Sequence, residues 1–189
     1  MTLVEALRGN LGGVEARWSD RILASYPTDG AKFYRASNDP FGNPVGAAVR
    51  RATASVLAWL VAEGTGAPST SDLDDLIRIR SVQGFTPAQA AGVVFALKDA
   101  IAAELGDDLA RFGAGDVVRL FARIDELALR AFDVYTESRE RIAEIRVRET
   151  RARTYSLLRR AGVIETEEES NDRSTGDKGQ GPARDGGRG

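Results

Sequence analysis

The stretch "DVVRLFARIDELALRAFDVY", residues 116–135, decides the fold class, because its apolar residues recur every three or four positions. The most regular line consists of Val117, Leu120, Ile124, Leu127, Ala131 and Val134. Phe121, Ala128, Phe132 and Tyr135 widen that line into a broad stripe. This breadth is typical of a core helix in a bundle, since a coiled coil needs only a narrow seam. No proline or glycine occurs between Asp116 and Arg160, so the sequence predicts one long helix over that range.

Four further helices are expected on the N-terminal side of this stretch, and no strand. They are residues 2–25 with a break at Gly12–Gly13, residues 44–63 ended by Gly64 and Gly66, residues 71–84, and residues 86–106. Between Tyr26 and Phe41, the turn signals "YP", "DG" and "NDP" predict a long irregular connection. The expected fold is therefore all-α, a bundle of about five helices with a long protruding C-terminal helix and a disordered tail.

The corner "DPFGNPVG", residues 39–46, holds two prolines and two glycines in a chain that is otherwise helical. Asn43 is a favourable N-cap, and Pro44 suits the first helical position, where a missing N–H costs nothing. We expect Phe41 to pack under the start of the helix as a hydrophobic staple. The corner is also the first candidate interaction surface, made of Asp39, Pro40, Phe41, Asn43 and Pro44.

Arg78 and Arg80 fall near the end of the third helix, where cations are favoured. Together with Gln83 they form a predicted polar face, the second candidate interaction surface. The two arginines resemble an anion clamp, but a simpler interpretation is that they bridge to acids across the bundle. Both interpretations remain open at this stage.

The second half of the long helix is rich in arginine. Eight arginines and three glutamates occur between Arg139 and Arg160, and the apolar line is lost there. Three pairs have the favourable i,i+4 order and should support the helix: Glu137–Arg141, Glu144–Arg148 and Glu149–Arg153. The candidate contact residues are Arg141, Arg146, Arg148 and Arg151.

This arginine-rich segment could be a solvated helix, a protein interface or a nucleic-acid contact. Tyr155 is the one aromatic residue among its basic residues, and an acidic stretch follows. Because nucleic-acid binding favours aromatics within a net basic domain, we prefer a protein interface. We expect a helical domain at residues 1–138, the extension at 139–161 and a disordered tail at 162–189.

Composition excludes several kinds of site. The chain has no cysteine and no histidine, so disulfides, thiolate chemistry and histidine-bound zinc or haem are excluded. The paired acids Asp74–Asp75 suit a helix first turn, and Asp125 or Glu126 is expected to be half-buried beside an arginine. We therefore expect no enzyme activity, no cofactor and no metal. With no signal peptide or apolar span, a cytoplasmic protein is expected.

Three segments in this order resemble one family: "DPFGNPVG", "LDDLIRIRSVQGFTPAQA" (residues 73–90) and "IDELALRAFDVYTESRERIAEIRVRE" (residues 124–149). They are similar to the N-terminal domain of RsbRD, an RsbR-type co-antagonist of the switch kinase RsbT in the stressosome. The resemblance covers residues 18–153. It implies a sensory helical domain that is globin-like, binds no haem and forms a homodimer.

The same resemblance implies a partner, either a STAS-domain protein or a switch kinase. No strand-containing segment follows the long helix in this sequence, so we expect a form of the input domain without the STAS domain. The expected function is non-enzymatic regulation through protein–protein contacts in stress or partner-switching signalling. The alternatives are a structural accessory subunit of a larger complex and a nucleic-acid-binding protein that uses the arginine-rich helix.

Overall fold

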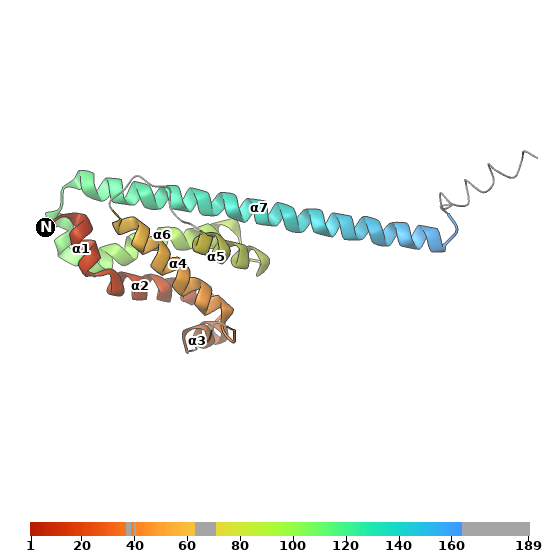
Figure 1. The fold of residues 1–189 in the computed structure, drawn as a ribbon, viewed down its shortest axis with the longest axis horizontal. Coiled ribbons are helices and arrows are strands. Elements are labelled where there is room, and N and C mark those ends of the chain that lie inside the picture. The colour runs from red at the N-terminus through yellow and green to blue at the C-terminus, as the bar shows by residue number, and fades with distance from the viewer. Residues whose placement is uncertain (37–38, 40, 63–70, 164–189) are drawn as a thin grey trace, which may run out of the picture. The chain divides into compact units, whose positions relative to one another are not determined.

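The computed structural model describes residues 1–36, 39, 41–62 and 71–163 (Figure 1). Over those ranges the chain contains helices and connections but no strand. The helices are α1 (Leu3–Gly9), α2 (Leu11–Ala24), α3 (Thr28–Ala36), α4 (Pro44–Val61), α5 (Ser71–Val82), α6 (Pro87–Leu105), the 3₁₀-helix η1 (Gly106–Arg111) and α7 (Ala114–Arg160). The predicted all-α class and the long C-terminal helix are confirmed.

The chain divides into two compact units, Met1–Arg141 and Ile142–Gly189. The first unit contains α1 to α6, η1 and the part of α7 up to Arg141. In the second unit the described residues are the rest of α7 and the turn that follows it, as far as Val163. The predicted domain boundary after Ser138 and the globin-like arrangement stay predictions.

One hydrophobic core holds the first unit together. α7 contributes Leu120, Ile124, Leu127, Ala131 and Val134, all buried, which confirms most of the seam read from the sequence. Trp18 of α2 is fully buried, and its indole Nε1 donates a 2.7 Å hydrogen bond to the Val93 carbonyl of α6. Phe132, expected in the stripe, is 49% exposed instead. The buried face of α7 is therefore narrower than its apolar pattern.

The break between the first two helices was predicted at the wrong place. It falls at Asn10, and Gly12 and Gly13 lie inside α2. A β-carbon at Gly13 would collide with the Glu104 carboxylate of α6, which Arg17 also holds through a 2.6 Å ion pair. A larger residue at position 13 would therefore have to displace the Glu104 carboxylate, a contact that the local sequence pattern does not reveal.

The connection expected between Tyr26 and Phe41 contains a helix, α3, so that prediction was wrong. The turn signals lie mostly at its ends, and a small second cluster fixes it in place. Ala31 of α3 is buried in that cluster with Tyr26 and Val45. Arg35 of α3 also pairs with Asp20 of α2 at 2.9 Å. Packing against α2 and α4 therefore overrides the weak local propensity.

Two predicted helix starts are confirmed in detail. The Asn43 side chain accepts a 2.9 Å hydrogen bond from Gly46 N–H at the start of α4, with Pro44 at the first position. Thr86 and Gln89 form a reciprocal capping box at the start of α6. α4 ends at Val61, and the predicted stop at Gly64 and Gly66 lies outside the described residues.

Candidate functional site

The corner before α4 is a compact turn built on Asp39. Its carboxylate accepts hydrogen bonds from Phe41 N–H at 2.9 Å and Gly42 N–H at 3.0 Å. Phe41 is 97% exposed, so the predicted hydrophobic staple is wrong. Pro40 lies outside the described residues, and Pro44 is exposed. The role of the corner as an interaction surface stays a prediction.

Asn43 joins this corner to α3. Its side chain is fully buried, and its Nδ2 donates a 2.8 Å hydrogen bond to the Tyr34 carbonyl. A β-carbon at Gly46 would collide with that carbonyl and with the Asn43 side chain. This position in the first turn of α4 therefore requires a glycine. Asn43 therefore ties the start of α4 to the backbone near the end of α3.

The predicted polar face on α5 is split by the structure. Arg78 is exposed and pairs with Asp75 on its own helix at 3.1 Å, so it does not bridge across the bundle. Gln83 is exposed just beyond α5. Arg80, in contrast, is 0% exposed, so it cannot belong to a surface. Residues two positions apart on a helix point in different directions. The prediction of one polar face with both Arg78 and Arg80 did not take this into account.

Arg80 lies in an aromatic environment with no acid. Its guanidinium carbon is 3.9 Å from the centroid of the Phe85 ring and 5.1 Å from that of Tyr26. Its Nη2 donates to Ser25 Oγ at 3.0 Å and to the Gln89 carbonyl at 3.1 Å. Within the described ranges, no carboxylate forms an ion pair with Arg80.

Three polar atoms in this cluster have no hydrogen-bond partner among the described residues. They are Nε and Nη1 of Arg80 and the phenol oxygen of Tyr26, all inaccessible to water. Burial lowers the pKa of Arg80 and raises the pKa of Tyr26, and in each case the other group opposes the shift. A buried cation that lacks both an acid and a full set of acceptors is uncommon and suggests a functional position.

The turn after α5 explains how Phe85 reaches Arg80. Gly84 has φ +83°, a conformation that favours glycine. It turns the chain so that Phe85 N–H donates back to the Arg80 carbonyl at 3.3 Å. This local geometry places the Phe85 ring over the guanidinium.

An open surface depression of about 400 Å³ adjoins the Arg80 cluster, and we call it the Tyr26 pocket. Four of its lining residues, Ser25, Tyr26, Phe85 and Gln89, are those that contact Arg80. Its other lining residues are Pro27, Tyr34, Gln83 and Gly84. Arg80 therefore lies directly behind the wall of an aromatic pocket.

The first part of α7 contacts the same region. The Tyr135 hydroxyl donates a 2.7 Å hydrogen bond to the Phe85 carbonyl, and Ser138 and Ser81 share a 2.6 Å hydrogen bond. Ser81 follows Arg80 in the sequence, and the Phe85 ring stacks on the Arg80 guanidinium. Both bonds therefore join α7 to the surroundings of Arg80. A movement of the Phe85 segment would therefore act on α7 directly.

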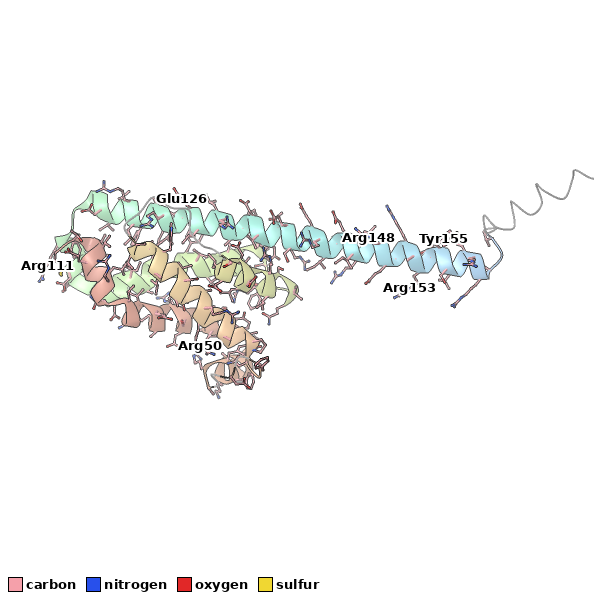
Figure 2. All side chains as sticks on the ribbon, in the orientation of Figure 1. Arg50, Arg111, Glu126, Arg148, Arg153 and Tyr155 are labelled. Atoms are coloured by element: carbon pink, nitrogen blue, oxygen red, sulfur yellow. The ribbon has the colours of Figure 1, made fainter. Side chains whose placement is uncertain are left out.

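The candidate arginines of α7 are exposed. Arg141 ends the first unit, and Arg146, Arg148 and Arg151 lie in the second. Arg148, Arg153 and Tyr155 mark this segment of α7 in Figure 2. Over the described residues, none of the three predicted i,i+4 pairs forms an ion pair, so the expectation that they support the helix was wrong. Exposed pairs gain little, because water screens them and ordering two long side chains costs entropy.

The sequence reasoning missed a second stripe on this segment. Continuing the core seam leads to Ser138, Arg141 and Ile145, but a different set of positions carries no charge. These positions are spaced by four, three, four and three residues, and we call them the extension stripe: Ala143, Val147, Thr150, Thr154 and Leu157. All five are exposed in the second unit. The spacing is that of a coiled-coil seam, so a heptad count could have found it.

The candidate acids have cationic partners. Asp74, nearly buried, accepts from Arg130 of α7 at 2.9 Å, and this contact raises the pKa of Arg130. Asp125 pairs with Lys98 at 2.5 Å, and the predicted arginine is thus a lysine. Within the described part of the chain, no cluster of acids could hold a metal ion, and no helix is long and apolar enough to cross a membrane.

α6 and α7 also form an apolar groove of about 590 Å³ in the first unit. Phe95, Leu129 and Phe132 are 46%, 67% and 49% exposed there. No charged residue lines the groove, and the lining is completed by Thr86, Pro87, Ala88, Ala91, Gly92 and Ala128. Apolar patches of this kind on a surface commonly mark a contact with another protein.

The match to known proteins covers most of these features. The model of the RsbT co-antagonist protein rsbRD N-terminal domain matches residues 13–150, most of the chain. The chain belongs to this family. No curated protein and no solved structure matches it, and no STAS domain is found within the 189 residues.

Membership in the rsbRD N-terminal domain family confirms the resemblance inferred from the three sequence segments. It supports a regulatory input domain related to the stressosome. The matched range includes Arg80, the Tyr26 pocket and the first three residues of the extension stripe. Thr154 and Leu157 lie beyond it.

Proposed function

We propose that this protein is a non-enzymatic regulatory input domain that binds another protein through the extension stripe of α7. The observation that carries this proposal is a charge-free line of exposed residues at coiled-coil spacing on an arginine-rich helix. Helices in proteins are stabilised mostly by packing of one face, and the described residues of this segment from Ala143 onward are all exposed. A partner helix along the stripe would supply that packing.

The charges beside the stripe favour a different protein over a second copy. Arg146, Arg153 and Arg160 follow one edge of the stripe at intervals of seven residues. In a parallel pair of identical helices, Arg146 would face Arg151 of the other copy, and like charges at these positions oppose pairing. A partner helix with glutamates at its edges would be attracted by the same arginines.

The family description names RsbT, which suggests a switch kinase of that type as partner, and the resemblance to RsbR-type proteins adds STAS-domain proteins. The acids of the first unit support a non-enzymatic role, because Asp74 and Asp125 each hold a cation in an ion pair. We place this activity in the cytoplasm, where such a kinase would act. A constitutive accessory subunit would use the same helix but would respond to no signal.

We further propose that the first unit forms a homodimer through the α6–α7 groove. The resemblance to RsbR-type domains implies a dimer, and this groove is apolar and uncharged. It also has both protruding rings and a hollow, as a self-complementary two-fold interface requires. The dimer and the partner complex would therefore use different parts of α7.

The test of the partner proposal is affinity purification from the native cell with matched substitutions. Val147→Glu places a charge on the extension stripe. Ile145→Glu is the control, because Ile145 is similarly exposed, at 48% against 49%, and lies off the stripe. We expect Val147→Glu to reduce recovery of a STAS-domain protein or switch kinase at least about tenfold, and Ile145→Glu to leave it unchanged.

Equal recovery with both variants would reject the extension stripe as the interface. Recovery of one unrelated enzyme complex under all growth conditions would instead favour the accessory-subunit function. Binding that disappears between low and physiological salt, with nucleic acid in the eluate, would favour nucleic-acid binding.

A further inference from the structure

The Arg80 cluster is costly for a purely structural element. The guanidinium is fully buried, no described carboxylate balances it, and two of its nitrogens have no acceptor. Burying an unbalanced charge is unfavourable, and structural arginines in cores are usually paired. The Tyr26 phenol oxygen beside it is also buried, and it is close enough to Arg80 to influence its pKa but makes no hydrogen bond of good geometry with it. The stacked rings of Phe85 and Tyr26 compensate only part of this cost.

We propose that the Tyr26 pocket binds a small organic carboxylate, whose charge is balanced by Arg80 directly behind the pocket wall. The chemistry of the pocket selects this class of ligand. Tyr26, Tyr34, Pro27 and Phe85 offer apolar and aromatic surface to the body of the molecule. Arg80 supplies the positive charge, and the low local dielectric behind the wall strengthens its attraction for an anion.

The size of the cavity and its neighbours agree with this ligand class. A volume of about 400 Å³ suits a small molecule. Arg78 is exposed and already paired with Asp75, so the neighbouring arginine cannot substitute for Arg80. Tyr34, whose ring is 5.2 Å from that of Tyr26, is held by the hydrogen bond from Asn43 to its carbonyl. Asn43 thereby supports the backbone beneath one wall of the site.

The ligand would be sensed by α7. Phe85 lines the pocket, and its carbonyl accepts the hydrogen bond from the Tyr135 hydroxyl. Ser81, which follows Arg80, is bonded to Ser138. A carboxylate that displaces the Phe85 ring would therefore change contacts at the part of α7 that precedes Arg141. This inference names the class of ligand that the input domain binds. It rests on the proposed function only because it treats the chain as an input domain.

Binding is tested on the full chain by protein-observed NMR with four acids and their neutral amides. The probes are acetate, butyrate, benzoate and phenylacetate, each compared with the corresponding amide. We expect at least one acid to give saturable shifts at the backbone amides of Gly84, Phe85 and Gln89. Its amide should bind about tenfold more weakly or worse, as expected for loss of one charge-assisted interaction.

Two variants separate Arg80 from its neighbour. Arg80→Met should weaken binding of the acid about tenfold or more, while Arg78→Met, on the same helix and exposed, should not. Arg80→Lys should restore part of the affinity, because it keeps the charge. In the absence of ligand, Arg80→Met should unfold at no lower temperature than the wild type, since it removes an unbalanced buried cation.

Several outcomes would overturn the proposal. They are the absence of saturable shifts with all four acids, equal binding of acid and amide, and a loss of stability in Arg80→Met without ligand. Shifts that never reach the amides of Tyr135 or Ser138 would reject the link to α7. Partner recovery in the purification experiment does not depend on these results, so failure of the ligand site and failure of the proposed function are distinguishable.

Discussion

Asn43 and Arg80 are both fully buried polar residues, but their hydrogen bonding differs. Both ends of the Asn43 amide are used, by Gly46 N–H and by the Tyr34 carbonyl. Arg80 leaves Nε and Nη1 without acceptors among the described residues. The full hydrogen bonding of Asn43 is typical of a residue that stabilises the fold. The incomplete hydrogen bonding of Arg80 is typical of a residue with a functional role.

Asn43→Ala should therefore destabilise the protein more than the loss of an ordinary N-cap does. The substitution removes the cap of α4 and also leaves the Tyr34 carbonyl without its donor, so we expect a loss of about 2–3 kcal/mol in the free energy of unfolding. Urea denaturation measures this loss. The control is Thr86→Ala, an exposed capping-box residue, expected to cost about 1 kcal/mol. Equal losses for the two variants would show that the Tyr34 contact contributes nothing.

Tyr26 makes stability depend on alkaline pH. Burial raises the pKa of its phenol above the ordinary value of 10.0, so the folded state keeps the proton at a pH where the unfolded chain has released it. Stability is fully present below pH 10 and falls as the pH rises toward the folded pKa. Urea unfolding on both sides of pH 10 should show a smaller decline for Tyr26→Phe than for the wild type. Tyr155→Phe, an exposed residue, should behave like the wild type, and a matching decline in all three proteins would contradict this prediction.

At the scale of the elements, α7 is attached to α5 by one nearly buried ion pair. Asp74 is among the few buried polar residues, and it lies in the first turn of α5, where the helix dipole also favours an acid. Its partner Arg130 is half-exposed, so water screens part of the interaction. The pair joins positions 56 residues apart, which no local pattern could reveal.

Arg130→Met should lower the free energy of unfolding by about 1–2 kcal/mol, because the Asp74 carboxylate loses its charged donor. The matched control is Arg119→Met on the same helix, whose pair with Asp116 is more exposed and should contribute less than about 0.5 kcal/mol. A double-mutant cycle with Asp74→Asn isolates the coupling between the two residues. A coupling near zero would mean that the nearly buried pair contributes no more than a surface pair.

The whole molecule raises the question of self-association. If the α6–α7 groove is a dimer interface, Phe132→Glu should convert the protein to a monomer, because a charge would be buried in an uncharged contact. Light scattering after size-exclusion chromatography measures the mass. Val118→Glu is the control, since Val118 is 65% exposed on α7 and does not line the groove. A wild-type monomer, or a dimer that persists in Phe132→Glu, would reject this interface.

The sequence by itself determined the all-α class, the buried seam of α7, the caps at Asn43 and Thr86, and the family. These features depend on periodicity, on residues three or four positions apart and on the order of short segments, which are all local properties. The extension stripe belongs with them, although it was overlooked because the core seam was followed instead. The tertiary structure alone decided that α3 is a helix, that Phe41 is exposed and that Arg80 is buried.

The physical reason is that burial and pairing depend on residues far apart in the chain. Arg80 contacts Ser25 at a separation of 55 residues, and Tyr135 reaches Phe85 across 50. A pattern of arginines on one helix predicts where cations suit the helix dipole but not which of them the neighbouring helices cover. The Tyr26 pocket exists because two distant segments, one around Tyr26 and one from Arg80 to Gln89, pack together, and only the packed chain brings them into contact.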